Sequence, residues 1–148
     1  ASSIRAASKI LRSRSLVIII SDFKVEGYEK PLGLLAAKHD VVCVRINSSI
    51  DSFLPAAGSI QFKDPETNFK MILPTSSKLF QMEYKKNFTE DVLRWDNTCT
   101  HSLANPVLLN VTDDAVKVLG NFFLSKQSNR RILKNTIGRL GADVWKAF

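Results

Sequence analysis

The chain has 148 residues, of which 45% are hydrophobic and 24% are charged, and its net charge is +7. This length and composition are typical of one globular domain, and they exclude a collagen-like, disulfide-rich or highly charged unfolded chain. No apolar run approaches the roughly 20 residues that cross a bilayer, and the first residues lack the order of a secretory signal peptide. We therefore expect a cytoplasmic protein, either free or peripheral to the membrane.

The positive charge lies at the two ends of the chain. Residues 1–20 contribute +4 and residues 126–148 contribute +5, whereas residues 21–125 carry −2. A nucleic-acid surface built into the central part is therefore not expected. Basic ends more often form a solvated helix face than a contact with an acidic partner, RNA or lipid headgroups. Over residues 127–148 the bases are Arg130, Arg131, Lys134, Arg139 and Lys146.

A helix over 3–11 and a strand over 15–21 are predicted at the start of the chain. The strand contains one uninterrupted apolar run, Leu16, Val17, Ile18, Ile19 and Ile20. A short run without alternation is typical of a strand that is buried on both faces of a parallel sheet. Asp22 follows the strand at its carboxyl end, where open α/β sheets bind their ligands.

The next segments predict a βαβ unit and a hairpin. A helix over 31–38 precedes a strand over 41–46, which should lie parallel to the first strand. Two alternating segments around a proline-containing turn predict a β-hairpin at about 59–73. A helix from Ser76 onward follows, with an apolar stripe that we assign to the core rather than to a partner groove. The stripe consists of Phe80, Tyr84, Phe88, Val92 and Trp95.

The last segments complete the predicted fold. A third strand over 106–112 leads into a helix that is capped by Thr112-Asp-Asp, and residues 127–148 form a basic amphipathic segment. We expect an α/β fold of the partial doubly wound, Rossmann-like type. It would have a parallel sheet of about three strands plus a β-hairpin, flanked by helices. Residues 1–126 would form the domain, and residues 127–148 would follow it.

The residues that are capable of chemistry do not form a recognisable catalytic pattern. Cys43 fits a small buried hydrophobe better than a disulfide or redox residue, and Cys99 has no metal-ligand spacing. His39 and Asp40 lie at a predicted helix terminus, where the helix dipole favours a partly charged imidazole. His101 is predicted in a solvated polar loop. Because the P-loop, Gly-x-Gly-x-x-Gly, nucleophile-elbow and zinc motifs are all absent from the sequence, we do not expect an enzyme.

Five segments together resemble one known family. They are residues 13–23, residues 31–42, Leu54-Pro-x-x-Gly58, Asp64-x-Glu-Thr67 and Thr112-Asp-Asp. In this combination residues 3–126 resemble the bacterial von Willebrand factor A-like family catalogued as domain of unknown function fifty-eight. The resemblance implies a doubly wound α/β domain that is encoded beside a MoxR-type AAA+ ATPase.

The resemblance also implies a metal-ion-dependent adhesion site at the top of the sheet. Such a site holds Mg²⁺ with an Asp-x-Ser-x-Ser loop, a Thr from a second loop and an Asp after the fourth strand. Asp22 matches the last of these, and the Asp-x-Ser-x-Ser loop is absent from this sequence. We therefore expect the C-terminal half of such a domain, with no cofactor unless an upstream half completes the Mg²⁺ site. Asp22 then fits a loop-capping or helix-capping residue better than a metal ligand.

In the family's fold, the strand that resembles residues 16–20 pairs with the first strand of the domain. Without that neighbour it becomes an uncovered edge, which we expect to pair with the same strand of a second chain in a homodimer. The alternative covers are the chain's own hairpin and its basic tail. The function expected is a non-enzymatic interaction module or scaffold that acts with a MoxR-type AAA+ ATPase or an envelope assembly. The alternative is a nucleic-acid-binding Rossmann-like domain that uses its basic ends.

Overall fold

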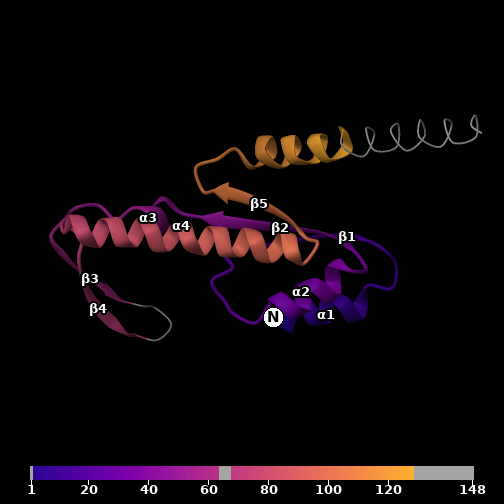
Figure 1. The fold of residues 1–148 in the computed structure, drawn as a ribbon, viewed down its shortest axis with the longest axis horizontal. Coiled ribbons are helices and arrows are strands. Elements are labelled where there is room, and N and C mark those ends of the chain that lie inside the picture. The colour runs from indigo at the N-terminus through magenta and orange to yellow at the C-terminus, as the bar shows by residue number, and fades with distance from the viewer. Residues whose placement is uncertain (1, 64–67, 129–148) are drawn as a thin grey trace, which may run out of the picture. The chain divides into compact units, whose positions relative to one another are not determined.

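A computed structural model describes residues 2–63 and 68–128 (Figure 1). It has a three-stranded parallel sheet, a two-stranded antiparallel sheet and flanking helices, which confirms the predicted fold class. The elements are α1 (Ser2–Ile10), β1 (Leu16–Ser21), α2 (Glu29–Ala36), β2 (Asp40–Asn47), α3 (Ser49–Ser52), β3 (Ser59–Lys63), β4 (Lys70–Pro74), α4 (Lys78–His101) and β5 (Asn105–Asn110). Residues 115–128 are also helical.

The chain divides into two compact units after Thr112. In the second unit, the Asp114 carboxylate accepts a hydrogen bond from the backbone N–H of Lys117 at 3.1 Å and thereby caps the helix over 115–128. The predicted cap is confirmed, and Asp114 is the residue that provides it. Of the predicted basic segment, Arg130, Arg131, Lys134, Arg139 and Lys146 lie outside the described residues.

The β1–α2–β2 segment forms the predicted parallel βαβ unit. Leu16 lies beside Asp40, and Ser21 lies beside Arg45. Strand β5 then pairs in parallel with the other side of β2, so the order is β1-β2-β5 and β2 is the central strand. α2 begins at Glu29 rather than at Pro31, and a first helical turn tolerates Pro31 because its missing N–H has no partner there in any case.

The hydrophobic core lies on one face of this sheet. Helices α1, α2 and α4 all contribute buried residues to it, so they pack on the same side as the inward-facing residues of β1 and β2. The buried members are Ile4, Phe23, Tyr28, Leu32, Leu35, Val41, Cys43, Trp95, Cys99 and Ala104, with Val17 and Ile19 packed against them.

The expectation that β1 is buried on both faces is wrong. Leu16, Ile18 and Ile20 are 54%, 44% and 61% exposed, while Val17 and Ile19 face the core. Among the described residues β1 is hydrogen-bonded to β2 alone, so it is an end strand and has fewer neighbours than β2. The central strand β2 has instead the burial that was expected of β1, because Val41 to Arg45 are all buried.

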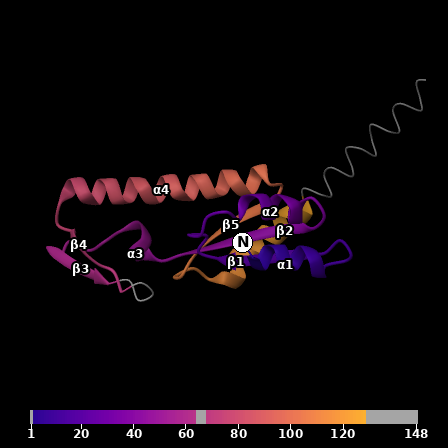
Figure 2. The same cartoon turned by 90° about the horizontal axis from the view of Figure 1, so that it is seen from below.

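Strands β3 and β4 form the predicted antiparallel hairpin, with Ser59 beside Pro74 and Lys63 beside Lys70. The short helix α3, which precedes this hairpin, is an element that the sequence pattern did not predict. Figures 1 and 2 both show α4 running from the hairpin to the three-stranded sheet. Its 24 residues correspond to roughly 36 Å of helix.

The predicted core stripe on α4 is only partly buried. Trp95 is in the core, whereas Phe80, Tyr84, Phe88 and Val92 are half-buried, because the N-terminal part of the helix packs beside α3 rather than on the sheet. Within the residues that the structure describes, no helix is both long and apolar enough to cross a bilayer.

Candidate functional site

The turn after β1 is organised by Asp22. Its carboxylate accepts hydrogen bonds from the backbone N–H of Lys24 at 3.3 Å and from the Ser21 hydroxyl at 3.4 Å. The Ser21 hydroxyl in turn accepts from the backbone N–H of Phe23 at 3.1 Å. Because these contacts satisfy backbone donors in the turn, Asp22 stabilises the loop at the carboxyl end of β1.

Phe23 fixes this turn to the core. Its φ angle of 54° lies in the left-handed region, which costs free energy for a residue with a Cβ atom. Two aromatic contacts compensate for that cost. The Phe23 ring centroid lies 5.4 Å from that of Tyr28 in an edge-to-face arrangement, and 5.6 Å from that of Trp95. The loop after β1 is therefore anchored at both its side-chain and its backbone groups.

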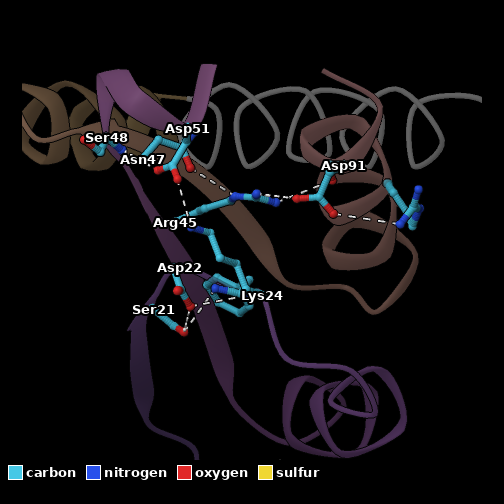
Figure 3. A network of polar contacts seen from close by, with 10 residues as sticks. Ser21, Asp22, Lys24, Arg45, Asn47, Ser48, Asp51 and Asp91 are labelled. Carbon is cyan, nitrogen blue, oxygen red and sulfur yellow. Dashed lines mark hydrogen bonds and ion pairs between the residues drawn. The ribbon is translucent and has the colours of Figure 1, made fainter. Parts of the chain in front are cut away.

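Lys24 and Asp51 link the loop after β1 to the segment after β2. The Lys24 ammonium lies 2.8 Å from one Asp51 oxygen, and the other Asp51 oxygen accepts the backbone N–H of Ser48 at 2.7 Å (Figure 3). The hydrogen bond to Asp51 raises the pKa of Lys24, and this effect outweighs that of burial, which lowers the pKa. Burial opposes ionisation of Asp51, but the hydrogen bonds from Lys24 and Ser48 outweigh it and lower the pKa of that carboxyl.

These pKa directions predict the pH range of the Lys24–Asp51 contribution to stability. The lowered pKa of Asp51 adds stability that is present above the unfolded-state value of about 4 and is lost as the pH falls further. The raised pKa of Lys24 adds stability that is present below about 10 and is lost as the pH rises. We expect Asp51→Asn to lower the unfolding free energy at pH 7 by less than about 1 kcal/mol, because the pair is partly exposed.

The measurement is urea unfolding at pH 3, 5 and 7. The difference in unfolding free energy between wild type and Asp51→Asn should have its full value at pH 5 and 7 and be smaller at pH 3. Glu83→Gln, an exposed substitution on α4, is the matched control and should show no such change. A difference that is equally large at pH 3 and at pH 7 contradicts the assignment.

Arg45 is the buried charge of the site. It is only 2% exposed, although it lies in the central strand β2. Its Nε donates to the Asn47 side-chain oxygen at 3.1 Å, and one terminal nitrogen contacts the Asp91 carboxylate of α4 at 2.5 Å. The guanidinium also lies over the Trp95 ring, 5.8 Å from its centroid. Figure 3 shows the side chain passing between Asn47 and Asp91, so Arg45 connects the sheet to α4.

A pocket of about 390 Å³ lies beside these contacts. It is lined by the loop residues 23–29 and by Asp91 and Arg94 of α4. Lys24 and Arg94 bring positive charge to its lining, while Glu26, Glu29 and Asp91 bring negative charge. A pocket of mixed charge that is also lined by Phe23 and Tyr28 suits a polar protein surface better than a ligand of a single charge sign.

The surroundings of Asp22 do not fit a magnesium ion on their own. Its polar neighbours are the Ser21 hydroxyl, the backbone N–H of Lys24 and the positive charge of the Lys24 ammonium. Mg²⁺ requires several oxygen ligands in an octahedral arrangement, and a neighbouring ammonium repels it. Over residues 2–63 and 68–128 no three His, Cys, Asp or Glu side chains form a group that could hold a metal ion.

The remaining predicted residues lie elsewhere. His39 is buried, and its Nδ1 accepts the backbone N–H of Ser15 at 3.3 Å. It therefore joins the segment after α2 to the start of β1, and its position at the helix terminus is as predicted. Asp40 begins β2, where its carboxylate meets the Asn105 amide at 3.5 Å. His101 is exposed as predicted, but it is the last residue of α4 rather than part of a loop.

The two cysteines meet in the core, which the sequence did not predict. Cys43 of β2 and Cys99 of α4 are both fully buried and unbridged, as expected for Cys43. A hydrogen bond between the thiols, together with burial, raises the pKa of Cys43, and the same bond lowers that of Cys99.

Four residues of the site were missed by the sequence analysis: Lys24, Arg45, Asp51 and Asp91. Arg45 had a usable signal, since a charged residue inside an apolar strand needs a buried partner. Ser48 and Asp51 also had one, because a Ser followed three residues later by an acid resembles a capping box. Asp91 had none, because it lies on the polar surface of a long helix.

The fold and the site define an α/β domain whose carboxyl-end loops are fixed by ion pairs. Residues 1–93 match the family described as "Protein of unknown function DUF58", and the chain belongs to this family. A stretch of 68 residues is 35% identical to an uncharacterized protein, MAV169, of Mycobacterium avium. That stretch covers 45% of this chain and 40% of the relative's length. No solved structure matches the chain.

Proposed function

We propose that this chain is a non-enzymatic interaction module of the von Willebrand factor A type, which acts as a scaffold with a MoxR-type AAA+ ATPase. The observation that carries the proposal is the state of the polar residues at the carboxyl edge of the sheet. Lys24 is paired with Asp51, and Arg45 is paired with Asp91. Side chains that are engaged with one another in this way are suited to holding loops in place rather than to proton transfer or nucleophilic attack.

Fixed loops favour recognition of a folded partner. The loop over 23–29 is anchored by the aromatic contacts of Phe23 and by the Lys24–Asp51 pair. A binding surface on loops that a rigid scaffold positions loses little entropy when a partner docks. We propose that the mixed-charge pocket between this loop and α4 is the docking surface, with Arg94 as its main exposed cation.

The family resemblance supports the identity of the partner and the incomplete metal site. In the proposal Asp22 is the one matching member of a metal-ion-dependent adhesion site, and it acts here as a loop-capping residue. In the proposal residues 1–126 are the C-terminal half of such a module, and the basic segment 127–148 follows it.

The test is a binding measurement with the MoxR-type ATPase that is encoded beside the gene. The purified ATPase is immobilised, and its affinity for the wild-type chain is compared with that for Arg94→Glu and Lys38→Glu. Arg94 lines the pocket, whereas Lys38 is an exposed residue beside the amino end of β2, so it serves as the matched control.

We expect Arg94→Glu to weaken binding by at least about tenfold, because it reverses a charge on the docking surface. Lys38→Glu should leave the affinity unchanged. Equal effects of the two substitutions contradict the proposed surface. Absence of binding, combined with a gel shift of RNA or DNA whose affinity falls steeply with salt, overturns the proposal in favour of nucleic-acid binding.

A further inference from the structure

Helix α4 has a second stripe of residues on the face that is turned away from the rest of its unit. The inner face contributes Trp95 and Cys99 to the core, and Figure 2 shows α3, the hairpin and the three-stranded sheet on that side of the helix. The outer stripe recurs at intervals of three and four residues, which is the spacing of a single helix face. It consists of Leu79, Met82, Lys86, Thr89 and Leu93, all of which are exposed.

The two borders of this outer stripe have opposite charges. Lys78 and Lys85 lie along one border, whereas Glu83 and Glu90 lie along the other, and all four side chains are exposed. With 3.6 residues per turn, the two members of each pair lie about two turns apart on the same side of the helix. A largely apolar seam between one basic and one acidic border is the pattern of a parallel two-stranded coiled coil.

We propose that the outer stripe of α4 docks on the same stripe of a second copy of the chain, with the two helices parallel and in register. In this arrangement the basic border of each helix meets the acidic border of the other. Lys78 approaches Glu83 of the second copy and Lys85 approaches its Glu90, and each pair forms twice because the dimer is two-fold symmetric. An antiparallel arrangement would bring like charges together along both borders, which is unfavourable.

The side chains of the stripe suit such a contact. Leu79, Met82 and Leu93 are largely exposed, and each removes apolar surface from water when it meets its counterpart. A hollow of about 470 Å³ beside Leu79 and Met82 gives room for the side chains of the second copy. Lys86 occupies one position of the seam, where its ammonium lies 3.7 Å from the carboxylate of Glu90 in its own helix. A single lysine in a seam costs stability but fixes the register of the two helices.

The helix is already formed before a second copy docks. Trp95 and Cys99 hold its inner face in the core, so the dimer does not require the folding of a free helix. Because the seam also contains a lysine and a threonine, we expect a weak and reversible dimer. The outer stripe does not include the pocket residue Arg94, so this contact does not depend on the proposed ATPase partner.

The first test is self-association, measured by sedimentation equilibrium over a range of concentrations. The acidic variant Lys78→Glu/Lys85→Glu and the basic variant Glu83→Lys/Glu90→Lys should each self-associate at least about tenfold more weakly than wild type, because like charges then meet along both borders. An equimolar mixture of the two variants should associate again. A wild-type chain that is monomeric at every concentration overturns the proposal, as does a mixture that associates no better than either variant alone.

The matched control is Lys9→Glu/Lys38→Glu, which changes the net charge by the same amount at exposed residues outside α4. It should leave self-association unchanged. If it weakens self-association as much as the acidic variant does, net charge rather than the outer stripe is responsible, and the proposed surface is wrong. Thermal melts at low protein concentration, where the chain is monomeric, should match wild type for every variant and show that each one folds.

The second test is disulfide trapping, which reports the orientation of the helices. Met82→Cys should cross-link to its own counterpart under mild oxidation, because a parallel register places each seam residue beside itself. Asn87→Cys is the matched control, since it is exposed on the same helix but points about 140° away. The wild-type chain is the blank, because both of its cysteines are buried. Equal cross-linking of the two variants contradicts the surface, and preferential cross-linking of Leu79→Cys with Leu93→Cys in a mixture contradicts the parallel orientation.

Discussion

Replacing Arg45 with methionine is expected to lower the free energy of unfolding by about 2–4 kcal/mol. The side chain is almost fully buried, so its removal breaks the contacts to Asn47 and Asp91 and leaves a gap above the Trp95 ring. The Asn47 oxygen then loses its donor inside the protein. The loss is smaller than for a fully buried ion pair, because the Asp91 carboxylate is 44% exposed and water can solvate it.

Urea unfolding at neutral pH measures this effect. Arg94→Met is the matched control, since Arg94 also pairs with Asp91, at 3.8 Å, but is 74% exposed. That substitution should change the unfolding free energy by less than about 0.5 kcal/mol. If the two variants lose the same amount of stability, Arg45 is not the residue that fixes α4 to the sheet.

Replacing Trp95 with alanine is expected to cost about 3–5 kcal/mol. Trp95 is buried in the core, where it contacts the Phe23 ring and supports the Arg45 guanidinium. Its removal creates a cavity. It also removes the ring contact that compensates for the free-energy cost of the left-handed φ angle of Phe23. Trp95→Phe should cost markedly less, because it keeps most of the packing and removes an indole N–H that has no partner among the described residues.

Leu93→Ala is the control for helix propensity, because Leu93 lies on the exposed side of the same turn of α4. A double-mutant cycle that combines Arg45→Met with Trp95→Ala measures the coupling between the two side chains. We expect the combined loss to be smaller than the sum of the single losses, because both substitutions remove the same cation–π contact. Strict additivity would show that the contact contributes nothing to stability.

Most of the fold could be predicted from local patterns. Continuous apolar runs identified β1 and β2, and the helix between them required a parallel pairing. The same reasoning failed for the burial of β1, because an apolar run does not distinguish a central strand from an end strand. Helix α3 was missed because its four residues are too few to establish a helical period.

The site was less predictable, because its contacts join distant parts of the chain. Arg45 and Asp91 are 46 positions apart, and no spacing rule relates them. The contact between Cys43 and Cys99 could not be predicted for the same reason, because no spacing rule relates the two cysteines. Asp22 was correctly placed after β1, but its neighbour Lys24 could not be recognised as the residue that links two loops.

The position of α4 has a consequence for the order of folding. The βαβ unit closes a shorter loop of the chain and can form early, whereas the turn at Phe23 and the burial of Arg45 both require a helix that lies much later in the sequence. Contacts of large sequence separation form slowly because a long loop must close first. Substitutions on the inner face of α4 should therefore act mainly by accelerating unfolding, while the early βαβ unit sets the rate of folding.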